Sequence, residues 1–243
     1  MLTQHRVLFS AVATLALAHV AQAMPVPLDL NPGDTYFLAF VTEGTRDAAS
    51  SNIADYNNFV QAQATLAGLQ LDNSANPVTW KAIGSTATVD ARDNIGNIIA
   101  PIYRMDLQRV ANDETDLFDG PFVSSIISPI LLDQFSTPFI VGVWTGSDSN
   151  GTQFLGNALG SSEPFFGLSG TIDQPWISFA TAATNQVSNN PFHLYAISSA
   201  LTVPTPTQAL NVPEPATALL LTLGALVLTA RGKSRQLLSL IHI

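Results

Sequence analysis

The 243-residue sequence contains no cysteine and only four histidines. The absence of cysteine excludes disulfides, thiolate metal sites and cysteine nucleophiles, so the stability of the fold must come from its core. His5 and His19 lie in an apolar N-terminal segment and His242 lies among the last residues, which leaves His193 for the region between them. A single histidine cannot form a multi-histidine zinc site.

Basic residues are also scarce. Between Met24 and Val212 there are five of them against seventeen acidic residues, a formal net charge of −12. A surface this acidic repels phosphate backbones and anionic lipids, so we expect no nucleic-acid partner. The five basic residues are Arg46, Lys81, Arg92, Arg104 and Arg109.

The N-terminus has the three parts of a secretory signal peptide. A positive charge at Arg6 precedes an apolar run from Val7 to Ala18, and Ala21-Gln22-Ala23 offers the small residues that a signal peptidase requires. A core helix is the alternative, but Met24-Pro-Val-Pro27 cannot continue a helix. We therefore predict that residues 1–23 are a signal peptide and that the mature chain begins near Met24.

The C-terminal region combines a short motif, an apolar run and a basic cluster. Pro213, Glu214 and Pro215 favour an extended, accessible backbone because two of the three lack an amide hydrogen. Residues 216–230 carry no charge, and a helix of this length spans about 22 Å, against about 30 Å for a bilayer core. Three basic residues follow, Arg231, Lys233 and Arg235, as a cytoplasmic flank would. The pattern predicts a short transmembrane helix.

Together, residues 212–236 resemble the PEP-CTERM sorting signal of Gram-negative, exopolysaccharide-producing bacteria. The resemblance implies that a membrane-embedded exosortase recognises Pro213, Glu214 and Pro215 and releases or transfers the protein to the outside. The expected localisation is thus an inner-membrane intermediate, held by the C-terminal helix, and then the cell surface or extracellular space. The alternative is an ordinary membrane anchor with an incidental Pro-Glu-Pro.

The final residues, 237–243, are predicted not to belong to the natural protein. Leu238 to Ile243 resemble the translation of a sequencing adapter, so His242 enters no site hypothesis. On this interpretation the natural C-terminus lies beyond about Arg235.

Residues 24–203 are enough for one domain with a sizeable core, and Pro204-Thr-Pro206 opens a linker over 204–211. Apolar runs predict buried strands, helical spacing predicts one helix, and polar clusters predict turns. The fold class expected is α+β. The predicted strands are 36–41, 80–83, 85–89, 101–105, 139–144 and 192–198; the helix runs from Ile53 to Ala67 with an Asn52–Asp55 capping pair, and the polar turn and acidic loop are 90–94 and 111–120.

A series of short motifs runs over about Tyr36 to Val203: Ala67–Leu69, Trp80, Ala91–Asn94, Leu117–Gly120, Val143–Gly146, Gly167–Ser169, Trp176 and Leu194–Ser198. Their order resembles bacterial C-type-lectin-like domains related to endostatin. This resemblance implies a single C-type-lectin-like domain, although relatives often carry cysteines near Trp176 and the last strand, where this chain has none. We expect Trp80, Trp144 and Trp176 to be buried.

Few residues suggest a chemical site. Asp113, Glu114, Asp116 and Asp119 could supply carboxylates to a cation, for which extracellular Ca²⁺ is the choice, or they could form a solvated acidic turn. The Asp148–Gly151 loop is not an EF-hand, because Leu159 occupies the position of the final glutamate. The sequence has no Gly-x-Ser-x-Gly elbow, and His193 lies in a strand pattern, which favours a structural histidine.

These observations predict a non-enzymatic, exported surface or matrix protein without a required cofactor. Its expected partners are signal peptidase, exosortase and extracellular polysaccharide, and its expected role is a structural or adhesive component of an exopolysaccharide biofilm matrix. The alternative is a secreted carbohydrate-active hydrolase that uses carboxylates alone.

Overall fold

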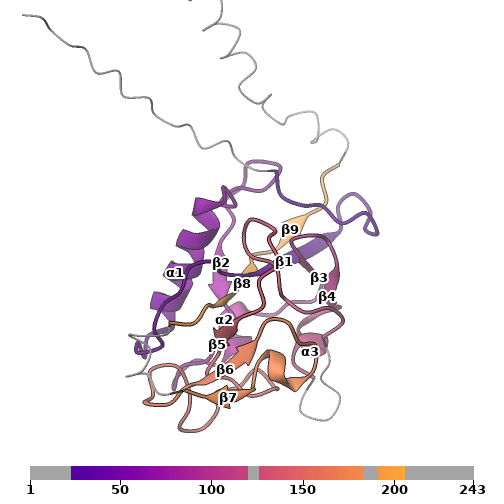
Figure 1. Cartoon of the computed structure of the whole chain (residues 1–243). Coiled ribbons are helices and arrows are strands. Elements are labelled where there is room, and N and C mark those ends of the chain that lie inside the picture. Colours follow the sequence, from indigo (N-terminus) through magenta and orange to yellow (C-terminus); the bar gives the residue numbers. More distant parts are fainter. Residues whose placement is uncertain (1–22, 120–125, 183–190, 206–243) are drawn as a thin grey trace, which may run out of the picture.

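The computed structural model describes residues 23–119, 126–182 and 191–205, which form a mixed α/β structure with mostly strands and few helices (Figure 1). The helical elements are α1 (Ile53–Leu66), α2 (Ala91–Ile95), α3 (Glu114–Leu117) and the 3₁₀ turn η1 (Gln174–Trp176). The strands are β1 (Thr35–Val41), β2 (Trp80–Ala82), β3 (Ile102–Arg104), β4 (Arg109–Ala111), β5 (Gly142–Trp144), β6 (Phe165–Leu168), β7 (Ala180–Thr181), β8 (Tyr195–Ser198) and β9 (Leu201–Thr202).

Strand β1 is the centre of the larger sheet. Its neighbours are β3, which is parallel to it, and β8, which is antiparallel, in the order β2-β8-β1-β3-β4; β9 pairs with the start of β1. Alternate side chains enter two hydrophobic clusters, with Leu38 and Phe40 on one face and Phe37 and Ala39 on the other. Because both faces are covered, β1 is apolar throughout rather than alternating. The predicted buried strand is confirmed.

Helix α1 covers one face of this sheet, against β2 (Figure 1). Asn52 caps the helix by accepting a hydrogen bond from the Ala54 amide at 3.1 Å. Gly68, at φ 76°, follows the last turn and stops it. The helix prediction is confirmed, but the Asn52–Asp55 capping pair is wrong: Ser50 Oγ accepts from the Asn52 amide at 3.1 Å and donates to Asp55 at 2.6 Å.

A smaller antiparallel sheet consists of β5, β6 and β7. Hydrogen bonds to backbone carbonyls connect this sheet to the neighbouring segments. Thr145, directly after β5, donates to the Ile177 carbonyl at 2.6 Å. The Trp144 amide donates to the His193 carbonyl at 3.0 Å, which joins β5 to the segment before β8.

Two predictions between residues 85 and 94 are wrong. Residues 85–89 form a turn instead of a strand, because the Thr86 amide bonds to the Val89 carbonyl at 2.9 Å and Ser85 Oγ accepts from the Ala91 amide at 2.8 Å. Residues 90–94 are not an open polar turn: Asp90 is the N-cap of α2, residues 91–94 belong to that helix, and the Asp90 carboxylate accepts from the Gln153 amide at 2.6 Å.

Other boundaries also moved. The acidic loop predicted at 111–120 contains the end of β4 and the short helix α3. Asp113 caps this helix, because its side chain accepts a hydrogen bond from the Asp116 amide at 2.9 Å. The strand predicted at 139–144 begins only at Gly142, and Ile140 is 75% exposed. The run at 192–198 contains β8, but β9 follows it and is the last strand described.

The three tryptophans are buried, as predicted, with exposures of 2% for Trp80, 0% for Trp144 and 1% for Trp176. Trp80 and Trp144 belong to the cluster beneath α1, whereas Trp176 belongs to the cluster on the other face.

Within the described ranges, no helix is both long and apolar enough to cross a membrane. The predicted transmembrane helix lies outside the described residues, as do nearly all of the predicted signal peptide and most of the 204–211 linker.

Candidate functional site

The predicted sorting residues Pro213, Glu214 and Pro215 lie outside the described residues, but the structure shows where the chain leaves the domain. The Val203 amide bonds to the Asp34 carbonyl at 2.9 Å, just before β1. At the other end of the domain sequence, Tyr36 Oη donates to the Pro25 carbonyl at 2.9 Å. Both ends of the domain therefore meet the start of β1, and the two terminal segments join the domain at neighbouring points.

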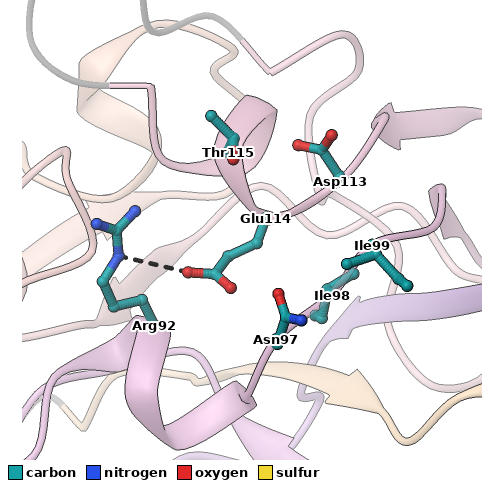
Figure 2. Close-up of a pocket in the computed structure, with 7 residues that line it drawn as sticks. All are labelled: Arg92, Asn97, Ile98, Ile99, Asp113, Glu114 and Thr115. Carbon is teal, nitrogen blue, oxygen red and sulfur yellow. Dashed lines mark ion pairs between the residues drawn. The ribbon is translucent and has the colours of Figure 1, made fainter.

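A hollow of about 410 Å³ lies between α2 and α3 (Figure 2). In Figure 1, α3 lies well away from β9, where the chain exits. The lining combines an apolar side with planar polar groups. It consists of Arg92, Asn97, Ile98, Ile99, Asp113, Glu114 and Thr115.

Arg92 and Glu114 form the charged centre of the hollow. Arg92 Nε lies 3.4 Å from Glu114 Oε1, and Figure 2 shows the two side chains pointing toward one another with Asn97 beside them. The Arg92 guanidinium also lies over the Phe118 ring, 5.8 Å from its centre. These contacts orient the guanidinium, although Arg92 Nε makes no hydrogen bond among the described residues, and the side chain stays 36% exposed.

The four acidic candidates of the 111–120 region do not form one common group in the described part of the chain. Asp113 caps α3, and Glu114 pairs with Arg92. Asp116 Oδ2 accepts from the backbone and side-chain nitrogens of Asn112 at 2.7 and 2.9 Å. Burial, and then the nearby Asp116 carboxylate, raise the pKa of Asp119. Each of the first three thus already has a protein partner.

Among the residues described, no group of three or more His, Cys, Asp or Glu side chains could hold a metal ion. The Asp148 carboxylate accepts from the backbone amides of Asn150 and Thr152, both at 3.0 Å, and so closes its own loop. Asp148 therefore shapes a turn in this structure.

His193 is held by the backbone. Its Nδ1 lies 2.7 Å from the Thr42 carbonyl, and its ring meets the Phe139 ring edge to face at 4.9 Å. Burial lowers the pKa of His193, although backbone contacts oppose the shift, so the neutral imidazole is favoured. These contacts support the prediction of a structural histidine.

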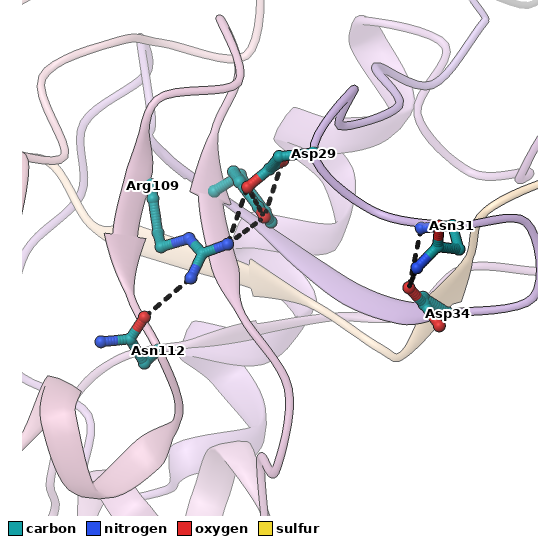
Figure 3. A network of polar contacts seen from close by, with 6 residues as sticks. Asp29, Asn31, Asp34, Arg109 and Asn112 are labelled. Carbon is teal, nitrogen blue, oxygen red and sulfur yellow. Dashed lines mark hydrogen bonds and ion pairs between the residues drawn. The ribbon is translucent and has the colours of Figure 1, made fainter.

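Sequence reasoning missed a polar network that links the N-terminal segment to the β3–β4 hairpin (Figure 3). Arg109 donates to Asp29 at 2.7 Å and to Asn112 at 2.9 Å, and Tyr103 Oη donates to Asp29 at 2.9 Å. Asp29 and Arg109 are 80 positions apart, so no local pattern could reveal the pair. Nearby, Asp34 accepts from the Asn31 amide at 2.7 Å and closes the turn before β1.

Comparison with known families finds one feature. Residues 211–235 match the PEP-CTERM protein-sorting motif, one residue from the boundaries expected from the sequence. Comparison with curated proteins found no match. The class of protein follows from the motif: this is an exported protein that an exosortase processes, and its sorting signal directs it through the membrane to the cell surface or the extracellular space.

Proposed function

We propose that the protein is a non-enzymatic component of an extracellular polysaccharide matrix, and that the hollow between α2 and α3 binds neutral polysaccharide. The sorting motif at 211–235 supports the extracellular setting. We also propose that residues 36–203 form a C-type-lectin-like domain, but the binding role rests on the hollow and not on this resemblance, because a fold does not imply a function.

The lining of the hollow suits a sugar ring. Ligand pockets typically combine apolar surface with a few well-placed polar groups. Here Ile99, which is 81% exposed, offers apolar contact for the C–H face of a ring, and the buried Ile98 lies beneath it in the core. Arg92 supplies hydrogen-bond donors, Glu114 supplies acceptors, and Asn97 supplies a donor and an acceptor. Two adjacent sugar hydroxyls can bond to a donor and an acceptor at the same time.

Electrostatics favours a neutral polymer. Two carboxylates, Asp113 and Glu114, line the hollow together with one guanidinium, that of Arg92, and the domain as a whole is strongly acidic. Such a surface repels anionic polysaccharides at long range. The site should therefore select by hydroxyl pattern rather than by charge.

The position of the hollow also supports the proposal. The terminal segments join the domain beside the start of β1 and β9, whereas α3 lies away from that region (Figure 1). A chain held at the membrane by its C-terminal segment could then present the hollow to the surrounding polymer. We propose further that binding needs no Ca²⁺, because Asp113, Glu114 and Asp116 already have protein partners.

The test is retention on neutral and anionic polysaccharides, run beside a hydrolysis screen. Replacing Glu114→Gln should weaken retention about tenfold, since one hydrogen-bonded group is worth roughly 1.4 kcal/mol. The exposed Asp173 is a matched control, and Asp173→Asn should leave retention unchanged. EDTA should have no effect.

Equal retention of Glu114→Gln and the parent protein would refute the site. Turnover that Glu114→Gln abolishes would instead reassign the protein to the carbohydrate-active hydrolases.

A further inference from the structure

Met24 is the first buried residue in the described part of the chain. Ala23 is exposed, whereas Met24 is 3% exposed and belongs to the hydrophobic cluster beneath α1. The transition falls on the bond that follows Ala21-Gln22-Ala23, the small residues expected to guide a signal peptidase. Burial and sequence therefore place the same boundary independently.

Both backbone groups of Met24 are bound by one side chain. The Met24 amide donates to Asn73 Oδ1 at 2.9 Å, and the Met24 carbonyl accepts from Asn73 Nδ2 at 3.0 Å, across 49 positions of sequence. An amide side chain suits this pair of contacts, because it offers an acceptor and a donor side by side.

The Asn73 loop is closed by contacts that do not involve Met24. Asp72 Oδ1 accepts from the amides of Ser74 and Asn76, both at 2.8 Å, which closes the turn around Asn73. The Asp72 carboxylate also brings negative charge to this end of the domain: burial, and then Asp72, raise the pKa of Tyr36, whose hydroxyl bonds to the Pro25 carbonyl.

Cleavage would strengthen these contacts. Hydrolysis of the Ala23–Met24 bond adds water: the hydroxyl goes to the Ala23 carbonyl, which leaves as a carboxylate, and the Met24 nitrogen becomes an ammonium. The single amide hydrogen is replaced by three donors with a positive charge, and charge-assisted hydrogen bonds are roughly twice as strong as neutral ones.

We propose that the exported chain is cut between Ala23 and Met24 and that Asn73 is the binding site for the α-ammonium this cut creates. Ala23 is exposed, so Met24 can dock with the signal peptide still attached, and removal of the signal peptide then strengthens its contact with Asn73. This inference is independent of the polysaccharide proposal.

A double-mutant cycle tests it. Two chains beginning at Met24 or at Ala23, each complete at the C-terminus, are released from a fusion by a protease that leaves no extra residue. Their thermal unfolding midpoints are compared in detergent. The chain that starts at Met24 should unfold about 2 to 4 °C higher, because its ammonium, and not a neutral amide, faces Asn73.

In Asn73→Ala the difference between the two start points should vanish. Asn76→Ala is the matched control, since Asn76 donates to Asp72 and not to Met24; it should keep the difference. A difference of the same size with and without Asn73 would overturn the proposal. So would an intact mass of the exported protein that places its N-terminus elsewhere than Met24.

Discussion

The two sheets of the domain are stabilised in different ways. In the larger sheet, β1 has backbone partners on both edges and buried side chains on both faces. Around the smaller sheet, short strands depend on polar contacts, such as Ser169 Oγ, which donates to the Phe139 carbonyl at 2.7 Å and accepts from the Val141 amide at 2.9 Å. Apolar burial dominates the first sheet, whereas the second combines aromatic contacts, such as Trp144 with Phe166, with hydrogen bonds and close backbone approach.

The largest effect should come from the larger sheet. Trp80 is buried, its ring lies 4.8 Å from that of Phe40, and its Nε1 donates to the Leu69 carbonyl at 2.8 Å. Trp80→Ala should lower the free energy of unfolding by about 3 to 5 kcal/mol. With no disulfide to compensate, the whole domain should unfold at a lower urea concentration.

Leu155→Ala is the control, because Leu155 is 90% exposed, and it should change stability very little. A Trp80→Ala protein as stable as this control would contradict the view that burial holds the larger sheet.

A smaller, local effect is expected in the smaller sheet. A Cβ added at Gly167 would lie 2.0 Å from the Trp176 carbonyl oxygen, so β6 and η1 would have to separate. Gly167→Ala should cost about 1 to 3 kcal/mol, as overpacking typically does. Hydrogen exchange should accelerate at the Phe179 amide, which bonds to the Phe166 carbonyl, while β1 amides stay protected. Equal acceleration in β1 would show that the two sheets open as one unit.

The smallest effect is a pH dependence at the edge of the larger sheet. The Arg104 hydrogen bonds lower the pKa of Asp106, and at Asp29 the bonds from Tyr103 and Arg109 outweigh burial and lower the pKa too. Stability from a lowered carboxyl pKa is present above the ordinary value of 3.8 and is lost as pH falls through the folded-state pKa.

The thermal unfolding midpoint should therefore decrease as the pH is lowered below about 4. In the Asp29→Asn, Asp106→Asn double variant this decrease with pH should be less steep. An unchanged slope would remove these two carboxylates from the acid response.

The contrast between the sheets also explains which elements the sequence could predict. The β1 run and the α1 spacing are local signals of burial, and both predictions are confirmed. The sequence predictions for residues 85–94 are wrong because contacts with distant backbone, such as the bond from the Gln153 amide to Asp90, set the conformation there, and local propensity does not. The same holds for Phe139 to Val141, whose backbone is held by Ser169.

The candidate sites also differ in whether a local sequence pattern could reveal them. The sorting motif is contiguous, so its residues could be recognised from sequence alone. The hollow joins Arg92 to Glu114, and the N-terminal contact joins Met24 to Asn73; both depend on the fold. The acidic cluster allows two interpretations from sequence, a cation site or an acidic turn, and in the structure Asp113 and Asp116 accept hydrogen bonds from the backbone of α3 and of Asn112.

The most direct test of the account is the intact mass of protein recovered from the outer surface of a host that contains the exosortase. The account predicts a C-terminus at or beside Pro213-Glu214-Pro215, and it predicts that Glu214→Ala blocks release while leaving membrane insertion intact, because the processing enzyme loses its one charged contact in the motif. Wild-type surface protein that still carries residues 216–235 would contradict exosortase processing and reclassify the segment as an ordinary membrane anchor.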